Sequence, residues 1–554
     1  MKSKTNLTPW NVIVNIAFSI TATILFVLSA SVRFYMHGAT NLLWIGLLAI
    51  TFTVFVFLTF ALPKLIKYVK RVCGAWINSD KPLFRKITFL YDYIFSGTHG
   101  IWIAFILTVL SFLPTLFAFY PGVFGNDGSV EIIQVFDPHQ TLTAHHPLTH
   151  IAMLVCAFVI GQSVFGSYTA GLLLYSIAQI LIMSIGITYL LNWLHQHGAP
   201  RLMRVFAAFF IIVNPVTQIL AINTTKDTVF AVLFLITSLQ LFDLLSIPEH
   251  KLKYSRYLAF FCVAVGMSLF RKQGYYLLAL VMISTLILLV KKWKVTFLLF
   301  ITVLVSWFLM GPFITMMHIP QGDAREMYSV PIQQISRVWV ADATHEITLN
   351  NRDKKMIESL IPAENLSTFN SANVDYVKYH FDTQRFNAHK KEYLKLYIRL
   401  AERYPKYYIA AWADLASTYW DLLQDGQFRQ LIFVNTYTDN VANFTPVSYA
   451  SYLPRYRAIL EKGASTAKTV VGNQALPIWI LLCLVAVSLY KRDKTLIIVS
   501  LFFMAQFGIL LLGPAALVRY AFPLMLCVPL MLYLCIWNVE LGNCKSSELT
   551  TSYK

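Results

Sequence analysis

The sequence predicts an all-α polytopic membrane protein with about 12 transmembrane helices, an outer interfacial helix and a mostly helical extracytoplasmic domain. Three observations predict this class: hydrophobic residues make up 57% of the 554 positions, charged residues only 13%, and long apolar stretches recur along the chain. Soluble domains carry about 25% charged residues. The composition therefore excludes a soluble enzyme, a disordered protein and a disulfide scaffold.

A transmembrane helix needs about 17–25 mainly apolar residues, and twelve stretches meet or nearly meet that length. They occupy residues 11–33, 42–62, 99–119, 168–194, 205–222, 228–246, 256–270, 275–290, 295–316, 474–490, 495–513 and 521–538. A thirteenth stretch, 146–163, is expected to lie along the outer interface, because a spanning helix there would move the later basic loops outside. This solution places both termini in the cytoplasm.

The net charge of +18 does not indicate nucleic acid as a partner. Segment 318–473 holds 18 basic and 16 acidic residues, so most of the surplus positive charge lies elsewhere. It forms short clusters between apolar stretches, at 64–71, 251–256, 291–294 and 491–494. Such loops face the cytoplasm. We therefore expect a multi-pass protein of the cell membrane, in contact with membrane lipids and with no nucleic acid.

The same pattern divides the chain into four parts. Residues 1–98 are expected to form an N-terminal transmembrane hairpin and a basic cytoplasmic loop, and 99–317 a transmembrane module whose first outer loop is 120–145. Residues 318–473 follow as a helical extracytoplasmic domain, and 474–554 as C-terminal transmembrane helices and a cytoplasmic tail. None of the seven cysteines lies in 318–473, so neither a disulfide framework nor a zinc site is expected there.

Asp127 lies in an irregular segment just beyond the outer end of an apolar stretch. One proline and three glycines in 120–129 interrupt regular structure, which places this carboxylate at the membrane boundary. Partial shielding tunes a carboxyl pKa for general-base work. Glu131, four residues on, would share a helical face with Asp127. The alternative is that Asp127 caps the following helix.

Two adjacent histidines, His145 and His146, precede Pro147 at the start of the expected interfacial helix. Adjacent imidazoles point in different directions, so a two-histidine metal site is not expected. One reading is structural, with a histidine bonding the free backbone groups of the first helical turn. The other is that one of them reaches a substrate phosphate or the Asp127 site.

Cationic side chains stand at the outer ends of three apolar stretches. Lys226 is followed by Asp227, Arg271 lies in the turn between two short stretches, and Arg519 precedes Tyr520. Ionisable groups at membrane depth are costly unless they are paired or functional, and a guanidinium suits bidentate phosphate recognition. The alternatives are a mutual Lys226–Asp227 pair and arginines that extend to lipid headgroups.

The expected extracytoplasmic domain begins with a Pro-Ile-Gln-Gln sequence that contains Gln333 and Gln334, with Arg337 close behind. Two amides and a guanidinium are suitable donors to sugar hydroxyls. They are equally suitable as packing residues of an ordinary loop.

Taken together, these motifs resemble the GT-C-type integral-membrane glycosyltransferases, which take sugars from polyprenyl-phosphate carriers at the outer face. The resemblance covers about residues 99–538 and rests on Phe124-Gly125-Asn126-Asp127, His145-His146-Pro147-Leu148, Lys226-Asp227, Arg271, Pro331-Ile332-Gln333-Gln334 and Arg519-Tyr520. It implies an extracytoplasmic active site in an uncharacterised bacterial branch of that superfamily. The sequence departs from the pattern in lacking a second acidic residue beside Asp127.

The resemblance implies a role for each candidate residue. Asp127 would be the catalytic base, Lys226, Arg271, Arg519, His145 and His146 would bind the donor phosphate, and Glu131, Asp227, Gln333, Gln334, Arg337 and Tyr520 would bind substrate. The donor would be a polyprenyl-phosphate-linked sugar and the acceptor a glycan or lipid of the cell envelope. The resemblance implies no definite cofactor, and a divalent cation, Mg²⁺ or Mn²⁺, is compatible with these residues.

Three alternatives stay open. A polysaccharide ligase or polymerase would use a polyprenyl-diphosphate donor on the same fold, with more outer arginines and a larger acceptor groove. A lipid or glycan transporter would place its ionisable groups near mid-bilayer on broken helices related by repeats, whereas here they gather at one face. A scaffold without catalytic activity would tolerate the loss of Asp127.

Overall fold

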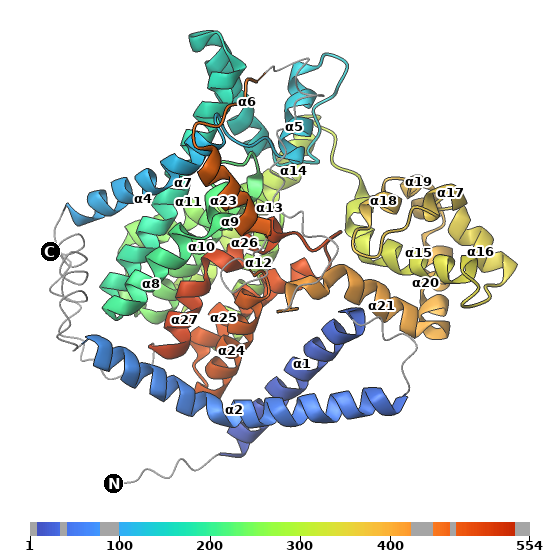
Figure 1. Cartoon of the computed structure of the whole chain (residues 1–554), viewed down its shortest axis with the longest axis horizontal. Helices are drawn as coiled ribbons and strands as arrows, with labels where there is room; N and C mark the ends of the chain where they lie inside the picture. Colours follow the sequence, from blue (N-terminus) through green and yellow to red (C-terminus); the bar gives the residue numbers. More distant parts are fainter. Residues whose placement is uncertain (1–7, 34–40, 78–98, 423–446, 466–472, 538–554) are drawn as a thin grey trace.

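The computed structural model describes residues 8–33, 41–77, 99–422, 447–465 and 473–537 (Figure 1). Every element of regular structure in these ranges is an α- or 3₁₀-helix, and strand-like pairing is limited to isolated bridges. The all-α prediction is confirmed for this part of the chain. Most of the expected linker after the N-terminal hairpin, part of the expected outer domain and the expected C-terminal tail lie outside the described residues.

Within the described ranges, six helices are long and apolar enough to cross a membrane, which supports a membrane protein. They contain the segments Pro9–Ser31, Gly100–Ala118, Leu148–Phe165, Tyr168–Gln196, Lys226–Ser246 and Trp293–Met316, from α1, α4, α6, α7, α10 and α13–α14 respectively. A seventh span is formed if α26 (Val518–Leu526) and α27 (Val528–Ile536), bent by 41°, are taken together.

The expected count of twelve spans is larger than this, for local reasons. Residues 205–222 form no single helix, because Asn214 caps a new helix at Pro215 and divides them into α8 (Arg201–Ile212) and α9 (Pro215–Leu220). Proline lacks the N–H that would continue the first helix. The remaining apolar helices are short: Gly46–Ala61 within α2 (Asn41–Ile77), α11 (Tyr254–Phe270), α12 (Gln273–Leu288), α24 (Leu476–Lys491) and α25 (Lys494–Leu510). Twelve spans stay a prediction.

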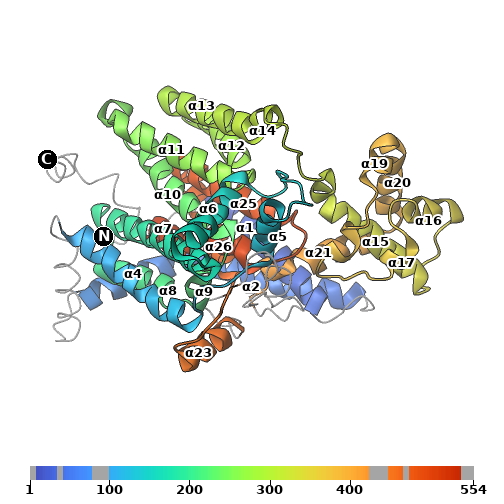
Figure 2. The same cartoon turned by 90° about the horizontal axis from the view of Figure 1, so that it is seen from above.

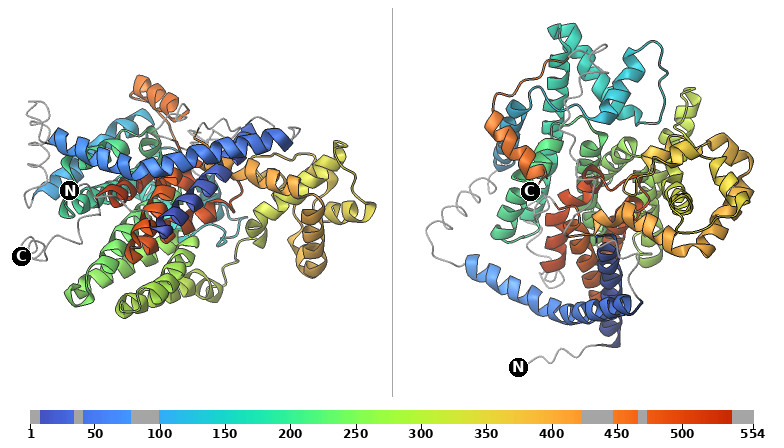
Figure 3. Two further views of the ribbon diagram at one scale, coloured as in Figure 1. Left: turned by 90° about the horizontal axis from the view of Figure 1, so that it is seen from below. Right: turned by 45° about the vertical axis from the view of Figure 1, so that its right-hand side comes forward.

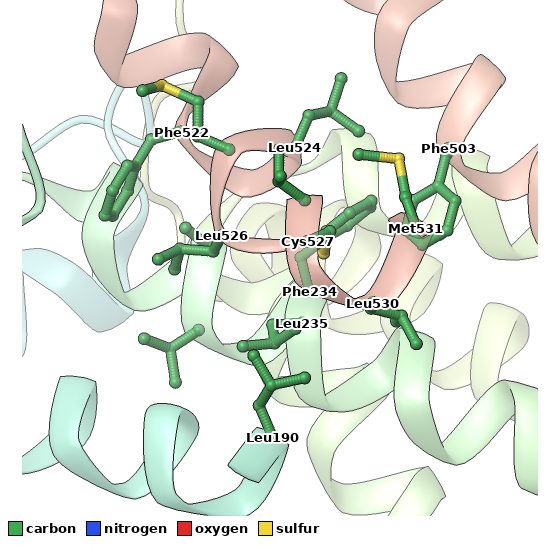
Figure 4. Close-up of a cluster of buried hydrophobic side chains, with 14 of the residues drawn as sticks. Leu190, Phe234, Leu235, Phe503, Phe522, Leu524, Leu526, Cys527, Leu530 and Met531 are labelled. Carbon is green, nitrogen blue, oxygen red and sulfur yellow. The ribbon is translucent and has the colours of Figure 1, made fainter. Parts of the chain in front are cut away.

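Helix α10 (Lys226–Ser246) is the centre of the bundle. In its apolar window 83% of the residues are buried, against 28% in α6 (Leu148–Phe165), which the sequence places at the interface. Phe234 of α10 stacks on Phe502 with ring centroids 4.7 Å apart. Figure 4 shows the same core around the bend between α26 and α27, where Cys527 lies among leucines from several helices.

The N-terminal hairpin consists of α1 (Pro9–Arg33) and α2 (Asn41–Ile77), and α2 runs across the base of the bundle (Figures 1 and 3). Trp10 donates from Nε1 to the Leu489 carbonyl at 2.8 Å, so α1 begins beside the end of α24. The first helix of the expected transmembrane module, α4 (Gly100–Ala118), lies against α7 (Tyr168–Gln196).

A second hydrophobic core lies at one side of the bundle (Figures 1 and 2). It is built by the 3₁₀-helix Ala324–Tyr328, α15 (Ser329–Ala343), α16 (Asn351–Glu358), α17 (Ala363–Leu366), α18 (Asp375–Lys378), α19 (Thr383–Ala388), α20 (Lys390–Arg403) and α21 (Pro405–Ala416). We call this part the lateral domain. Farther along, α23 (Pro454–Ser465) packs against α9.

Candidate functional site

Helix N-termini converge where the polar segments meet. Helices α5 (Asn126–Phe136), α6, α10 and α26 all begin here, and α12 begins two residues after Arg271. The first N–H groups of a helix have no partner within the helix, and the helix dipole places partial positive charge there. Such a position favours carboxylates and other anions.

Asp127, in the first turn of α5, lies between two cations. Its Oδ2 atom is 2.7 Å from Lys226 Nζ and 3.2 Å from Arg519 Nη1, and its Oδ1 atom accepts from Arg519 Nη2 at 3.3 Å. Burial opposes ionisation of this carboxyl, but Lys226 and Arg519 outweigh it and hold the pKa of Asp127 well below its ordinary value of 3.8. Asp127 is therefore an ionised, fully paired carboxylate at neutral pH.

A second carboxylate, Asp227, lies one residue after Lys226 and is 1% exposed. Its Oδ1 atom is 2.7 Å from Arg271 Nε, and its Oδ2 atom is 3.5 Å from Arg519 Nε. Thr225, the N-cap of α10, accepts from Asp227 N and bonds the Asp227 carboxylate through its hydroxyl. Arg519 therefore contacts both aspartates and links α5 to α10.

Tyr520 lies beneath the two arginines. The Arg271 guanidinium is 4.8 Å from the centre of its ring and that of Arg519 is 5.1 Å away. An aromatic face attracts a cation and displaces water from it. Tyr520 therefore lies with the two arginines of the site, and its role in binding substrate stays a prediction.

The third carboxylate, Glu131, is fully buried behind Asp127. Its Oε2 atom contacts His150 Nδ1, and its Oε1 atom is 3.4 Å from His146 Nδ1 and 4.0 Å from Lys226 Nζ. His150 Nε2 in turn bonds the Tyr175 hydroxyl at 2.8 Å. A chain of polar groups thus runs from Lys226 through Glu131 into the core.

His146 is close to Lys226 in a different way. Its Nδ1 atom accepts from Lys226 Nζ at 2.9 Å. Burial, followed by the positive charge of Lys226, lowers the pKa of His146 from 6.5 to about 3. His146 is therefore neutral at pH 7. The more exposed His145 makes an edge-to-face contact with the His146 ring, with the two ring centroids 4.7 Å apart.

The backbone around Asp127 is held by a loop that precedes α10. Val123 pairs with Asn223, and Gly125 N donates to Thr224 Oγ1 at 2.7 Å. A Cβ atom on Gly125 would approach Asn223 Oδ1 to 2.6 Å, so only glycine allows this close approach. The glycines near Asp127 therefore bring α5 and α10 together, and with them Asp127 and Lys226.

The cluster is electrically balanced. Asp127, Glu131 and Asp227 oppose Lys226, Arg271 and Arg519, and His146 is neutral. We call these seven residues the charge cluster. In the part of the chain that the structure describes, no three His, Cys, Asp or Glu side chains are grouped to hold a metal ion.

Gln333, Gln334 and Arg337 do not join the charge cluster. Gln333 Nε2 donates to the carbonyls of Asn370 and Ser371, Gln334 Nε2 to that of Tyr408, and Arg337 Nη1 is 3.8 Å from Asp414 Oδ2. All of these partners belong to the lateral domain. The structure therefore does not bring these three side chains to the charge cluster, because α15 turns them into its own domain. Their role in binding substrate stays a prediction.

Gln333 nevertheless has an indirect link to the site. The turn that it holds is followed by Val374, whose N–H donates to the Pro514 carbonyl at 3.0 Å, five residues before Arg519. On the other side, Ala144 N donates to the Pro320 carbonyl at 2.8 Å, next to His145. The lateral domain therefore contacts the chain on both sides of the charge cluster.

The sequence analysis did not assign His150 or Tyr175 to the site. His150, in the first turn of α6, follows His146 by four residues, and this spacing was the available signal. Tyr175 lies within a long apolar stretch of α7, where nothing in the pattern separates it from packing residues. Only the fold brings it to His150.

A sequence profile of a family of unknown function (DUF6020) matches residues 136–548. The chain belongs to this family. The DUF6020 match includes His145, His146, Lys226, Arg271 and Arg519, while Asp127 and Glu131 precede it. No curated protein and no solved structure matches the chain.

Proposed function

We propose that this protein is a membrane glycosyltransferase that moves a sugar from a polyprenyl-phosphate carrier to a hydroxyl group of an envelope glycan, lipid or protein. The observation that carries the proposal is the position of Asp127. A carboxylate capable of accepting a proton is in direct contact with two cations capable of binding phosphate, and all three lie at helix N-termini. Such an arrangement favours an anionic substrate.

In the proposed reaction the acceptor hydroxyl loses its proton to Asp127, and its oxygen attacks the anomeric carbon of the sugar. The bond between that carbon and the phosphate oxygen breaks, and its electron pair leaves with the polyprenyl phosphate. Lys226 and Arg519 stabilise the negative charge that develops on the leaving oxygen. Attack opposite the leaving group inverts the anomeric configuration.

The charge balance adds a step to donor binding. Lys226 and Arg519 already contact Asp127, so a donor phosphate takes contacts that the Asp127 carboxylate holds in the free protein. Losing two cationic partners raises the pKa of Asp127, which makes it a stronger base once the donor is in place. Asp227 keeps Arg271 oriented at 2.7 Å while this exchange occurs.

The same balance favours a monophosphate donor over a diphosphate. One phosphodiester charge can replace the one carboxylate that Lys226 and Arg519 share. A diphosphate would also compete with Asp227, which is almost fully buried and is held by Thr225 and Arg271. A ligase or polymerase with a diphosphate donor is therefore the second candidate.

We place the charge cluster on the extracytoplasmic side and both termini in the cytoplasm. Helix α10 begins at the cluster and ends next to the basic segment 248–256, while α12 begins beside Arg271 and ends before Lys291. Lys292 Nζ donates to the Leu244 carbonyl at 3.0 Å, so these two basic segments lie at the same end. Basic loops favour the cytoplasm, which supports this orientation.

The proposal is tested by mass spectrometry of envelope glycans and lipids from wild-type cells, a deletion strain and a strain with Asp127→Asn. We expect both altered strains to lose the same sugar mass and to accumulate its polyprenyl-phosphate carrier. A change in the deletion strain alone, with normal glycans in Asp127→Asn, would refute the catalytic role of Asp127 and favour transport or scaffolding.

A further inference from the structure

A cavity of about 210 Å³ opens at the opposite end of the bundle from the charge cluster. Its wall on α7 consists of Tyr189, Asn192, Trp193 and Gln196, whose spacing places them on one helical face; α10 adds Gln240, Asp243 and Leu244, and α11 adds Arg256 and Ala259. Asp243 follows Lys226 by 17 residues on the same helix. At 1.5 Å per residue the cavity is therefore about 25 Å from the charge cluster.

The carboxylate of this cavity already has partners. Trp193 Nε1 donates to Asp243 Oδ1 at 3.0 Å, His197 Nε2 is 3.0 Å from the same atom, and Arg256 Nη1 is 3.8 Å from Oδ2. Asp243 therefore fixes the positions of Trp193 and Arg256 and has little capacity left for a ligand.

The amides are different. Gln240 Oε1 is buried and makes no hydrogen bond with the residues that the structure describes. Asn192, which is half-buried, also lines this cavity. A polar group that is removed from water without a partner is costly, above all at membrane depth. The unpaired oxygen of Gln240, with a second amide lining the same cavity, indicates a ligand that donates a hydrogen bond, such as a hydroxyl group.

The position of the cavity indicates where that ligand comes from. Ile177, Leu181 and Ile185 are 38%, 38% and 52% exposed and lead at four-residue spacing along α7 to Tyr189. The basic residues Lys251 and Lys253 lie just before α11, the helix that carries Arg256. Exposed apolar side chains followed by basic ones mark the boundary between acyl chains and headgroups.

We infer that this cavity binds the headgroup of an anionic phospholipid whose phosphodiester carries hydroxyl groups, such as a glycerol or a sugar. Its phosphate faces Arg256, its hydroxyls bond the amides of Asn192 and Gln240, and one acyl chain lies along the Ile177–Ile185 stripe. The inference is independent of the proposed glycosyl transfer, because it uses none of the charge-cluster residues. Soluble glycerol phosphates share the headgroup chemistry, so the experiment has to separate the two sources.

The test is native mass spectrometry of the full-length protein titrated with dimyristoyl phosphatidylglycerol, dimyristoyl phosphatidylcholine or soluble glycerol 3-phosphate. We expect the wild type to bind the glycerol lipid about tenfold more tightly than the choline lipid and to bind glycerol 3-phosphate only weakly. Asn192→Leu and Gln240→Met are close in volume to the native residues. Each should reduce the preference severalfold, and Arg256→Gln should abolish it.

Lys253→Gln is the matched control, because it removes a neighbouring charge that does not line the cavity and should keep the preference. Equal binding of the two lipids by the wild type, or an unchanged preference in both amide variants, would overturn the proposal. Glycerol 3-phosphate binding as tight as that of the lipid would overturn the lipid assignment. Melting curves of each variant identify a substitution that merely unfolds the protein, and the remaining amide variant then decides.

Discussion

Replacing Asp127 with asparagine should have opposite effects on donor binding and on catalysis. The substitution keeps the shape of the side chain but removes the negative charge that Lys226 and Arg519 contact at 2.7 and 3.2 Å. A hydrogen bond to a charged group contributes about 1.5–3 kcal/mol. If the donor phosphate no longer has to displace such a contact, its affinity should rise about 10- to 100-fold.

Transfer should fall in the same variant. A positioned general base contributes about 10²- to 10⁴-fold to a rate, and an amide cannot accept the proton. Asp127→Asn should therefore hold a polyprenyl-phosphate sugar tightly and fail to transfer it. A simple loss of the site would weaken both properties together.

The assay is binding of a short-chain polyprenyl phosphate to purified protein, followed by single-turnover transfer from the corresponding sugar donor. Asp342→Asn is the control, because Asp342 forms a similar contact with Lys354 at 2.9 Å but lies in the lateral domain. It should change neither measurement. Unchanged or weaker donor binding by Asp127→Asn would refute the exchange, whereas a wild type that binds no polyprenyl phosphate would refute the proposed donor.

Three further predictions concern the same surroundings. Arg519→Lys should weaken donor binding about tenfold or more, because a lysine cannot reach both aspartates as Arg519 does. The same titration measures this affinity, and an unaltered value would exclude Arg519 from the phosphate site. His146→Gln should reduce the loss of stability at acid pH. In the wild type the pKa of His146 is about 3 when folded and 6.5 in its ordinary state, so the unfolded state binds the proton first. The wild type therefore loses stability as the pH falls below 6.5, by about 2 kcal/mol at pH 5. Melting temperatures at pH 7 and 5 measure this loss, and an equal drop in wild type and variant would contradict it. A single cysteine at the exposed Lys253 should react only with reagents that reach the cytoplasm, and one at His139 only with reagents added outside intact cells; the reverse pattern would invert the topology.

Much of the charge cluster was predictable because membrane proteins make ionisable residues conspicuous. Lys226, Asp227, Arg271 and Arg519 stand out at the ends of apolar stretches, and the glycines around Asp127 indicate an irregular segment. The structure brings these residues into direct contact. Which residue pairs with which was not predictable. Lys226 lies closer to Asp127 than to Glu131 only because of the way α5 packs against α10.

The differences between the sequence analysis and the structure have equally specific causes. Gln333 and Arg337 looked like donors to a sugar, but a sequence does not show which way a helix turns its amides, and the lateral domain uses both internally. The stretch 205–222 looked continuous in hydropathy although it contains Asn214-Pro215, a dipeptide that favours the end of one helix and the start of another. Tyr175 was not predictable for another reason: only the fold brings its hydroxyl to His150, which is 25 residues away in the sequence.

The neutrality of the charge cluster explains why its acids and bases occur together. Three cations buried at one membrane face without counter-charges would strongly destabilise the free protein, and three carboxylates with no cations would repel an anionic donor. Pairing them satisfies both requirements and leaves one shared contact, Asp127 with Lys226 and Arg519, as the place where an incoming anion can be exchanged. Asp227 is less suited to this role because Thr225 and Arg271 hold it within a buried helix start. In the proposed reaction the most exchangeable carboxylate is thus also the base, so that binding of the donor and activation of Asp127 would be one event.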